Sequence, residues 1–287
     1  MKLTKQYVAD IYKKIKEQRP IIHCITNAVT VNDCANILLA LGASPTMAHH
    51  PLEVGEITQG AKSLVCNFGA IGDYEAMLAA AMRAHELGHP IVIDPVGVSG
   101  SSYRREHALN LIDKVRPGCI RGNYSEIRAL LENCGTVTGV DAAEADQDAD
   151  HQAALIEVMK EYADEKQTIL IASGKTDIIT DGNVTYLCEN GDPLMAKITG
   201  SGCMSSVMLG AFLGVEESVE CAAACCSFMG IAGELAAERA RACGGGTMTF
   251  RDYMIDAVSM MKEEDFGRVS CWKTDCVFLQ RIGEKRD

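Results

Sequence analysis

The sequence lacks the features that mark membrane, secreted and nucleic-acid-binding proteins. No run approaches the roughly 18 consecutive apolar residues that a membrane span requires. The N-terminal segment MKLTKQYVADIYKKIKEQ is charged throughout and has no apolar core, which argues against a signal peptide and favours a soluble cytoplasmic protein. Lysine and arginine number 27 against 39 acidic residues, and the net charge of −12 leaves no extended basic face for nucleic acid. We expect neither a membrane nor a nucleic acid as a partner.

The cysteines lack the spacing of a metal site or a disulfide framework. Their number, 13, is odd, and no C-x-x-C pair occurs. Many fall in apolar stretches such as ECAAACCSFMG, where a thiol behaves as a small hydrophobic side chain. We therefore predict buried free thiols and a reducing compartment.

Several common catalytic motifs are also missing. The sequence contains no G-x-x-x-x-G-K-[ST] loop, no set of protein-kinase motifs and no G-x-S-x-G elbow. Because the protein is acidic, an anionic ligand would need backbone N–H donors, a few local cations or a metal ion.

Apolar segments with strand and helix periodicity alternate along the chain, which predicts a parallel sheet with helices on both faces. No linker or repeat is visible, so we predict one domain over residues 1–287. The predicted strands are IIHCIT, SPTMA, SLVCNFG, PIVIDPVG, CIRGN and TILIAS, followed by a hairpin over 177–192 that turns at Asp181-Gly182. The first predicted helix carries Val8, Ile11, Tyr12 and Ile15 on one face and ends before Pro20. The other predicted helices lie around 32–43, 51–61, 73–87, 106–115, 124–134, 151–164, 203–214, 217–240 and 250–262.

Three segments are predicted to lie outside this regular pattern. Residues 135–150 are polar and acidic and are interpreted as a loop. The polar C-terminal extension, 263–287, holds the only tryptophan, Trp272, and we expect it to pack peripherally. The adjacent His49 and His50 are interpreted as surface residues because neighbouring helical positions do not share a face.

The strongest local signal is the segment KITGSGCMSSVMLGAFLG, residues 197–214. Gly200, Ser201 and Gly202 lead directly into an apolar helix, whose first N–H groups and positive dipole end suit an anion such as phosphate. A tight packing corner is the structural alternative. Cys203 falls in the first helical turn, where the dipole can lower a thiol pKa, so that a thiolate could act as base or nucleophile. The alternative for Cys203 is a small residue tolerated beside glycines.

Charged residues follow two further predicted strands. Asp94 ends the run IVID, and ligands gather at the carboxyl ends of parallel strands. In IRGNYSEI, Arg121 could bind phosphate and Glu126 could help to hold Mg²⁺ through water. Capping of the following segments is the alternative for both acids. Ser173, after TILIA, is another strand-end candidate for nucleotide contact.

Taken together, these segments resemble the hydroxyethylthiazole kinase family of the ribokinase-like superfamily. The resemblance covers residues 20 to 262 and rests on the order and spacing of five pieces. They are ITNAVTVNDCANILLALGASPTMA, IVIDPVG, IRGNYSEI, ASGKTDIITDG and ITGSGCMSSVMLGAF. The sequence departs from the family in VNDCAN and NFGAIG, both near the expected thiazole pocket or its subunit boundary.

The resemblance implies a three-layer α/β/α fold with a mostly parallel sheet, assembled as a homotrimer with active sites between subunits. It implies phosphorylation of 4-methyl-5-(2-hydroxyethyl)thiazole by ATP, with Mg²⁺, in thiamine salvage. The implied substrate-binding residues are Asn27, Met47 and Gly200, and the implied ATP-binding residues are Arg121, Ser173, Ser201 and Gly202. Asp94 and Glu126 match the acids around Mg²⁺ and the phosphates. Cys203 stands where wider relatives carry an aspartate base.

Three other functions remain open at this point. One is a related kinase acting on hydroxymethylpyrimidine or a sugar, and another is an ATP-dependent dehydratase acting on damaged nicotinamide cofactors. The third is a catalytically silent nucleotide-binding protein, which the set Asp94, Arg121, Glu126 and Gly200 to Cys203 disfavours.

Overall fold

The computed structural model describes residues 3–131 and 149–274. Most of the predicted acidic loop, the end of the predicted helix 124–134 and residues 275–287 lie outside this part of the chain. The last two positions of the predicted loop, 149 and 150, instead begin helix α7.

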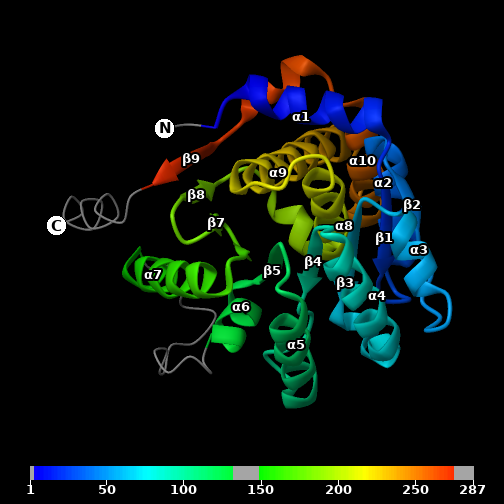
Figure 1. The fold of residues 1–287 in the computed structure, drawn as a ribbon. Helices are drawn as coiled ribbons and strands as arrows, with labels where there is room; N and C mark the ends of the chain where they lie inside the picture. The colour runs from blue at the N-terminus through cyan, green and yellow to red at the C-terminus, as the bar shows by residue number, and fades with distance from the viewer. Residues whose placement is uncertain (1–2, 132–148, 275–287) are drawn as a thin grey trace.

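The centre of the protein is a nine-stranded sheet with strand order β2-β1-β3-β4-β5-β6-β7-β8-β9 (Figure 1). Its strands are β1 (Ile21–Ile25), β2 (Ser44–Thr46), β3 (Ser63–Asn67), β4 (Ile91–Asp94), β5 (Cys119–Asn123), β6 (Ile169–Ser173), β7 (Asp177–Thr180), β8 (Thr185–Cys188) and β9 (Cys271–Thr274). The strands β1 to β6 pair in parallel, whereas β7, β8 and β9 join the sheet antiparallel. The predicted mostly parallel sheet and the hairpin are therefore confirmed.

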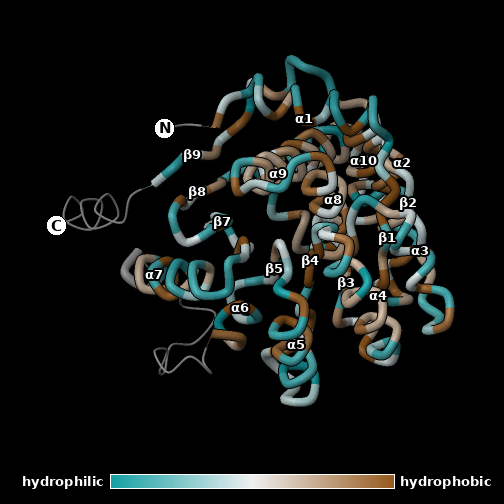
Figure 2. The backbone as a smooth tube through the Cα atoms, viewed as in Figure 1, coloured by the Kyte–Doolittle hydropathy of each residue, from teal (hydrophilic) through white to brown (hydrophobic). Residues whose placement is uncertain are grey.

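Helices cover both faces of the sheet, so the structure has three layers (Figures 1 and 2). One apolar cluster joins the sheet to α1 (Lys5–Gln18), α2 (Val31–Leu41), α8 (Ser201–Leu213), α9 (Val219–Ala242) and α10 (Thr247–Met260). A second joins it to α3 (Val54–Gly60), α4 (Tyr74–Leu87), α5 (Ser102–Val115), α6 (Tyr124–Leu131) and α7 (Ala149–Lys166). Because both faces are covered, β4 is buried at all four positions, as is typical of a parallel strand rich in β-branched residues.

The helix boundaries follow local sequence signals. In α1 the side chains of Val8, Ile11 and Ile15 are buried at helical spacing. Gly42 ends α2 with φ +99°, a conformation that glycine adopts without strain. Asp73 occupies the N-cap position of α4 but makes no side-chain cap hydrogen bond. The 3-10 turn η1 (Phe68–Asp73) runs directly into the helix at this point.

The C-terminal extension does more than pack peripherally. After the 3-10 turn η4 (Glu263–Arg268), β9 pairs with β8 and becomes an outer strand of the sheet. Phe266 and Cys271 are buried, and the Leu3 N–H donates to the carbonyl of Cys271 at 2.9 Å. Sequence periodicity missed this strand because only four residues of it are regular.

The buried-thiol prediction is confirmed in the described residues. All eleven described cysteines are free, and eight of them are buried. The helix α9 is long and apolar enough to span a membrane by length and composition, but 78% of its most apolar window is buried inside the protein. That is the environment of a core helix.

Candidate active site

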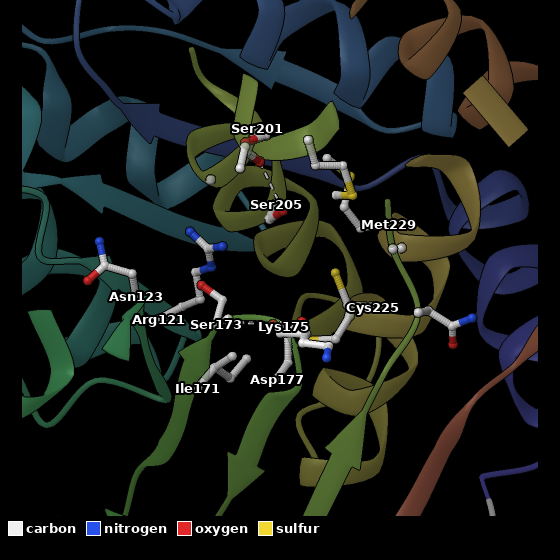
Figure 3. Close-up of a pocket in the computed structure, with 18 of the residues that line it drawn as sticks. Arg121, Asn123, Ile171, Ser173, Lys175, Asp177, Ser201, Ser205, Cys225 and Met229 are labelled. Atoms are coloured by element: carbon white, nitrogen blue, oxygen red, sulfur yellow. Dashed lines mark hydrogen bonds between the residues drawn. The ribbon is translucent and has the colours of Figure 1, made fainter. Parts of the chain in front are cut away.

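A cavity of about 1060 Å³ opens at the carboxyl ends of β4, β5 and β6, under the start of α8 (Figure 3). This is the edge at which ligands bind in open parallel sheets. The predicted site residues that line it are Asp94, Arg121, Glu126, Ser173, Gly200, Ser201, Gly202 and Cys203. The fold therefore brings together side chains from four separate segments of the sequence.

The turn before α8 requires glycine at position 200. Gly200 has φ +89°, and a Cβ there would lie 2.8 Å from Cγ2 of Thr30, so a side chain would be strained and crowded. The helix α8 has no side-chain cap at its N-terminus. Its first residues line the cavity, where N–H groups and the helix dipole favour an anion.

Arg121 provides a cation beside this helix terminus. A Cβ on Gly202 would lie only 2.7 Å from Nη1 of Arg121, so the missing side chain is what lets the guanidinium approach the turn. In Figure 3, Arg121 extends from β5 toward the start of α8, which carries Ser201. Guanidinium and backbone amides at one place form a site for phosphate oxygens.

Asp94 is buried and hydrogen-bonded. Its exposure is 1%, and its Oδ2 accepts hydrogen bonds from Asn67 Nδ2 and Ser206 Oγ, both at 2.8 Å. Burial raises the pKa of the Asp94 carboxyl to about 6, while the nearby Arg121 charge and these hydrogen bonds oppose the rise. The carboxylate is ionised above that pH and can then interact with a cation in the cavity.

Glu126 joins two loops at the strand ends. Its Oε1 accepts a hydrogen bond from Gly97 N at 3.0 Å, and its Oε2 accepts one from Asn123 N at 2.9 Å. It lies in the first turn of α6, as predicted. The loop after β4 and the end of β5 are thereby fixed by one carboxylate, which also lines the cavity.

Cys203 accepts hydrogen bonds from two amide side chains. Its Sγ lies 3.4 Å from Asn27 Nδ2 and 3.3 Å from Asn67 Nδ2. Burial, and secondly the Asp94 charge, raise the pKa of the Cys203 thiol above its ordinary value, although Thr30, Asn27 and Asn67 oppose this. The lowering of the Cys203 pKa that its first-turn position suggested is therefore wrong, because burial and the Asp94 charge raise the pKa.

The remaining predicted residues lie near the site in different ways. Ser173 lines the cavity, and its Oγ donates to the Gly122 carbonyl at 3.1 Å. Asn27 reaches the site only through Cys203 and Asn67, because it does not line the cavity. Met47 is half-buried against the apolar core and does not line the cavity either. His49 and His50 are exposed, as predicted.

Sequence reasoning missed three residues of the site. Asn67 ends β3 in register with Asp94 on β4, so the strand-end rule could have found it. Ser206 lies one helical turn after Gly202, a spacing that places both on one face of α8. Asp177 at the start of β7 lines the cavity, and burial raises the pKa of its carboxyl to about 6. No sequence signal distinguished Asp177 from an ordinary turn residue.

Comparison with known proteins shows which family has a matching sequence. Residues 12–264 match the model of the hydroxyethylthiazole kinase family. Hydroxyethylthiazole kinase 1 of Methanosphaera stadtmanae is 41% identical over 91% of this chain and 94% of its own length. The hydroxyethylthiazole kinase of Clostridium acetobutylicum is 42% identical over 86% of this chain and 92% of its own length.

A solved structure agrees with the sequence comparison. The hydroxyethylthiazole kinase protein of Pyrococcus horikoshii superposes with a TM-score of 0.83 at 31% identity, covering 94% of this chain and 100% of that one. A ribokinase-like superfamily protein of Enterococcus faecalis superposes with a TM-score of 0.58 at 11% identity, covering 90% of this chain and 94% of its own, which bears on the fold alone. The fold is ribokinase-like, and the chain belongs to the hydroxyethylthiazole kinase family.

Proposed function

We propose that this protein transfers a phosphoryl group from ATP to the hydroxyl of 4-methyl-5-(2-hydroxyethyl)thiazole, in the cytoplasm, as a step of thiamine salvage. The observation that supports this most is the approach of the Arg121 guanidinium to the start of α8, in a cavity that also holds Asp94 and Glu126. The names of the family and of its similar members support the choice of acceptor.

The residues of the cavity suit Mg²⁺ bound together with nucleotide phosphates. Among residues 3–131 and 149–274, no group of three or more His, Cys, Asp or Glu side chains could hold a metal ion by itself. A hard cation that keeps several waters and takes substrate phosphates as ligands fits two carboxylates of this kind. Asp94 and Glu126 would hold it, and the ion would offset the charge of the phosphates.

The chain's own groups position the donor and stabilise its charge. The amides of Ser201, Gly202 and Cys203 and the guanidinium of Arg121 bind oxygens of the transferred phosphoryl group, and Ser173 contacts the nucleotide. These interactions strengthen as charge develops, which is how phosphoryl transfer is mainly catalysed.

The acceptor hydroxyl is proposed to lie beside Cys203, Asn27 and Gly200. Because the pKa of the Cys203 thiol is raised, the thiol stays protonated at neutral pH and orients the alcohol rather than removing its proton. We further propose a homotrimer in which a neighbouring subunit completes the thiazole pocket near Met47. Val29 and Leu52, which lie close in sequence to Asn27 and Met47, are 75% and 88% exposed, and exposed apolar residues of this kind suit such a contact.

One assay tests the function directly. Purified protein with ATP, Mg²⁺ and the thiazole alcohol is expected to yield the alcohol monophosphate, observed by mass spectrometry, and chelation of the metal should abolish it. Hydroxymethylpyrimidine and a sugar serve as competing acceptors. A larger kcat/KM for either of them, or ATP consumption without a phosphorylated alcohol, would contradict the proposal.

Substitution of Cys203 tests the role of the thiol. Cys203→Ala should lower kcat by less than about tenfold, below the ~10²-fold or more that loss of a general base costs. Cys203→Asp should retain activity, because Asn27, Asn67 and Thr30 would donate hydrogen bonds to its carboxylate. Steady-state kinetics check both, with the exposed Cys243→Ala as the control. A folded but inactive Cys203→Asp enzyme would disprove this role.

A further inference from the structure

The rim of the cavity includes a segment without regular secondary structure. Residues 189–192 connect β8 to the 3-10 turn η3 (Pro193–Lys197), and all four line the cavity. A segment of this kind has no regular backbone hydrogen bonds that would fix its conformation. Its shape therefore depends on side-chain hydrogen bonds and on neighbouring elements.

Asn190 makes several of those bonds. Its Nδ2 donates to Glu234 Oε1 at 3.0 Å and to the Arg268 carbonyl at 2.9 Å, while its Oδ1 accepts from Ser270 N at 2.7 Å. A Cβ on Gly230 would lie 2.5 Å from atoms of Asn190, so the rim packs directly against α9. One amide thus links the rim to a core helix and to the C-terminal extension.

The backbone of the C-terminal extension also holds the rim. Ser270 accepts a hydrogen bond from Glu189 N at 2.9 Å through its carbonyl, in addition to the bond it donates to Asn190. Directly beyond it, Cys271 pairs with Cys188, so the rim begins where the β8–β9 ladder ends. Ser270 and β9 lie past residue 264, where the match to the family model ends.

We infer that Asn190 is a positioning residue for the nucleotide. The C-terminal segment 268–274 fixes the conformation of Asn190 and thereby sets the affinity of the cavity for nucleotide. The inference rests on the proposed function only in that a nucleotide occupies the cavity. If Ser270 is displaced, Glu189 loses the acceptor of its backbone N–H, and Asn190 loses the donor to its Oδ1. The rim then occupies its binding-competent shape for a smaller fraction of the time, and the apparent affinity falls by that fraction.

Two variants separate this role from general stability. Asn190→Ala removes these three hydrogen bonds and the weaker one that Cys188 Sγ donates to Asn190 Oδ1 at 3.9 Å. Ser270→Pro removes the N–H whose hydrogen bond Asn190 Oδ1 accepts at 2.7 Å, and the proline Cδ in its place also pushes the Asn190 amide away. The preceding Val269, with φ −49° and ψ 117°, already has the extended backbone that a following proline requires. Exposed Glu238, whose carboxylate pairs with the Arg268 side chain, provides the control Glu238→Gln on the same helix as Glu234.

The measurement is calorimetric titration of the full-length protein with Mg·ADP, followed by KM for ATP and for the alcohol. Ser270→Pro should weaken ADP binding by about fivefold, the factor that one hydrogen bond typically represents, and Asn190→Ala should weaken it by at least as much. The KM for ATP should rise in parallel, while kcat and the KM for the alcohol stay within about twofold of wild type, because a positioning effect on affinity leaves the transfer step unchanged. Glu238→Gln should bind ADP like the wild type.

The outcomes distinguish this inference from the proposed function. Unchanged ADP affinity in both folded variants, or an equal loss in Glu238→Gln, overturns the inference. If Ser270→Pro does not fold, Asn190→Ala decides alone. A wild-type protein that binds Mg·ADP but does not phosphorylate the thiazole alcohol contradicts the proposed substrate, while the binding measurements still test the rim. A wild-type protein that does not bind ADP overturns both.

Discussion

Replacing Asp94 with asparagine is expected to lower kcat by on the order of 10²- to 10³-fold, the usual cost of removing a group that stabilises charge in the transition state. The amide keeps the shape of the side chain and can still accept the hydrogen bonds from Asn67 and Ser206. What it loses is the negative charge that would face Mg²⁺. The Mg²⁺ concentration for half-maximal activity should therefore rise sharply in a metal titration.

Stability measurements provide the control for this variant. The folded pKa of Asp94, about 6, lies above its ordinary value of 3.8, because burial penalises the charged form. At pH values between these two pKa values, the unfolded chain binds fewer protons at this carboxyl than the folded protein does. The free energy of unfolding therefore falls as the pH rises from about 4 through about 6. Above that window, Asp94→Asn should be more stable than wild type, by up to about 3 kcal/mol. Exposed Asp113→Asn is the matched control, and an unchanged Mg²⁺ titration in Asp94→Asn would rule out the assigned role.

Replacing Glu126 with glutamine is expected to cost a comparable factor in turnover for a different reason. Each carboxylate oxygen accepts one backbone N–H, from Gly97 and from Asn123. An amide nitrogen in place of one oxygen would face an N–H donor, and a buried donor without an acceptor costs roughly 1–3 kcal/mol. Since both loops reach the edge of the cavity, the variant should lose both metal dependence and the geometry of the site.

The measurement for Glu126→Gln is kcat and KM for ATP over a range of Mg²⁺ concentrations, together with thermal unfolding. The exposed Glu106→Gln on α5 is the control. A Glu126→Gln enzyme with the wild-type dependence on Mg²⁺ would show that the residue has only a capping role, which was the alternative left open by the sequence.

The strand-end rule explains which parts of the site could be predicted from sequence. Asp94, Arg121 and Ser173 each end or immediately follow an apolar run, and parallel pairing brings such ends together whatever the details of packing. Asn67 meets the same condition but was not recognised, because an asparagine after an apolar run is also typical of an ordinary turn. Gly200 was predictable because glycine directly before an apolar helix is typical of a turn in which the backbone comes close to a ligand or a neighbouring segment.

The ionisation of Cys203 could not be predicted because it depends on burial, which local sequence does not give. The helix dipole favours a thiolate at this position, but solvent exclusion and Asp94, more than a hundred residues earlier in the chain, favour the thiol more strongly. The strand β9 was missed for a similar reason. Its four residues show no useful periodicity, and only their pairing with β8 makes them a strand.

The two borders of the sheet have a consequence for solubility. Outer strands present unpaired N–H and C=O groups, and a long flat border invites other molecules to add strands and aggregate. Here one border, β2, is only three residues long. At the other, β9, the Cys271 carbonyl is already occupied by the N–H of Leu3. Both borders therefore offer a poor template for recruiting a foreign strand, and the N-terminal residues contribute to colloidal stability as well as to the fold.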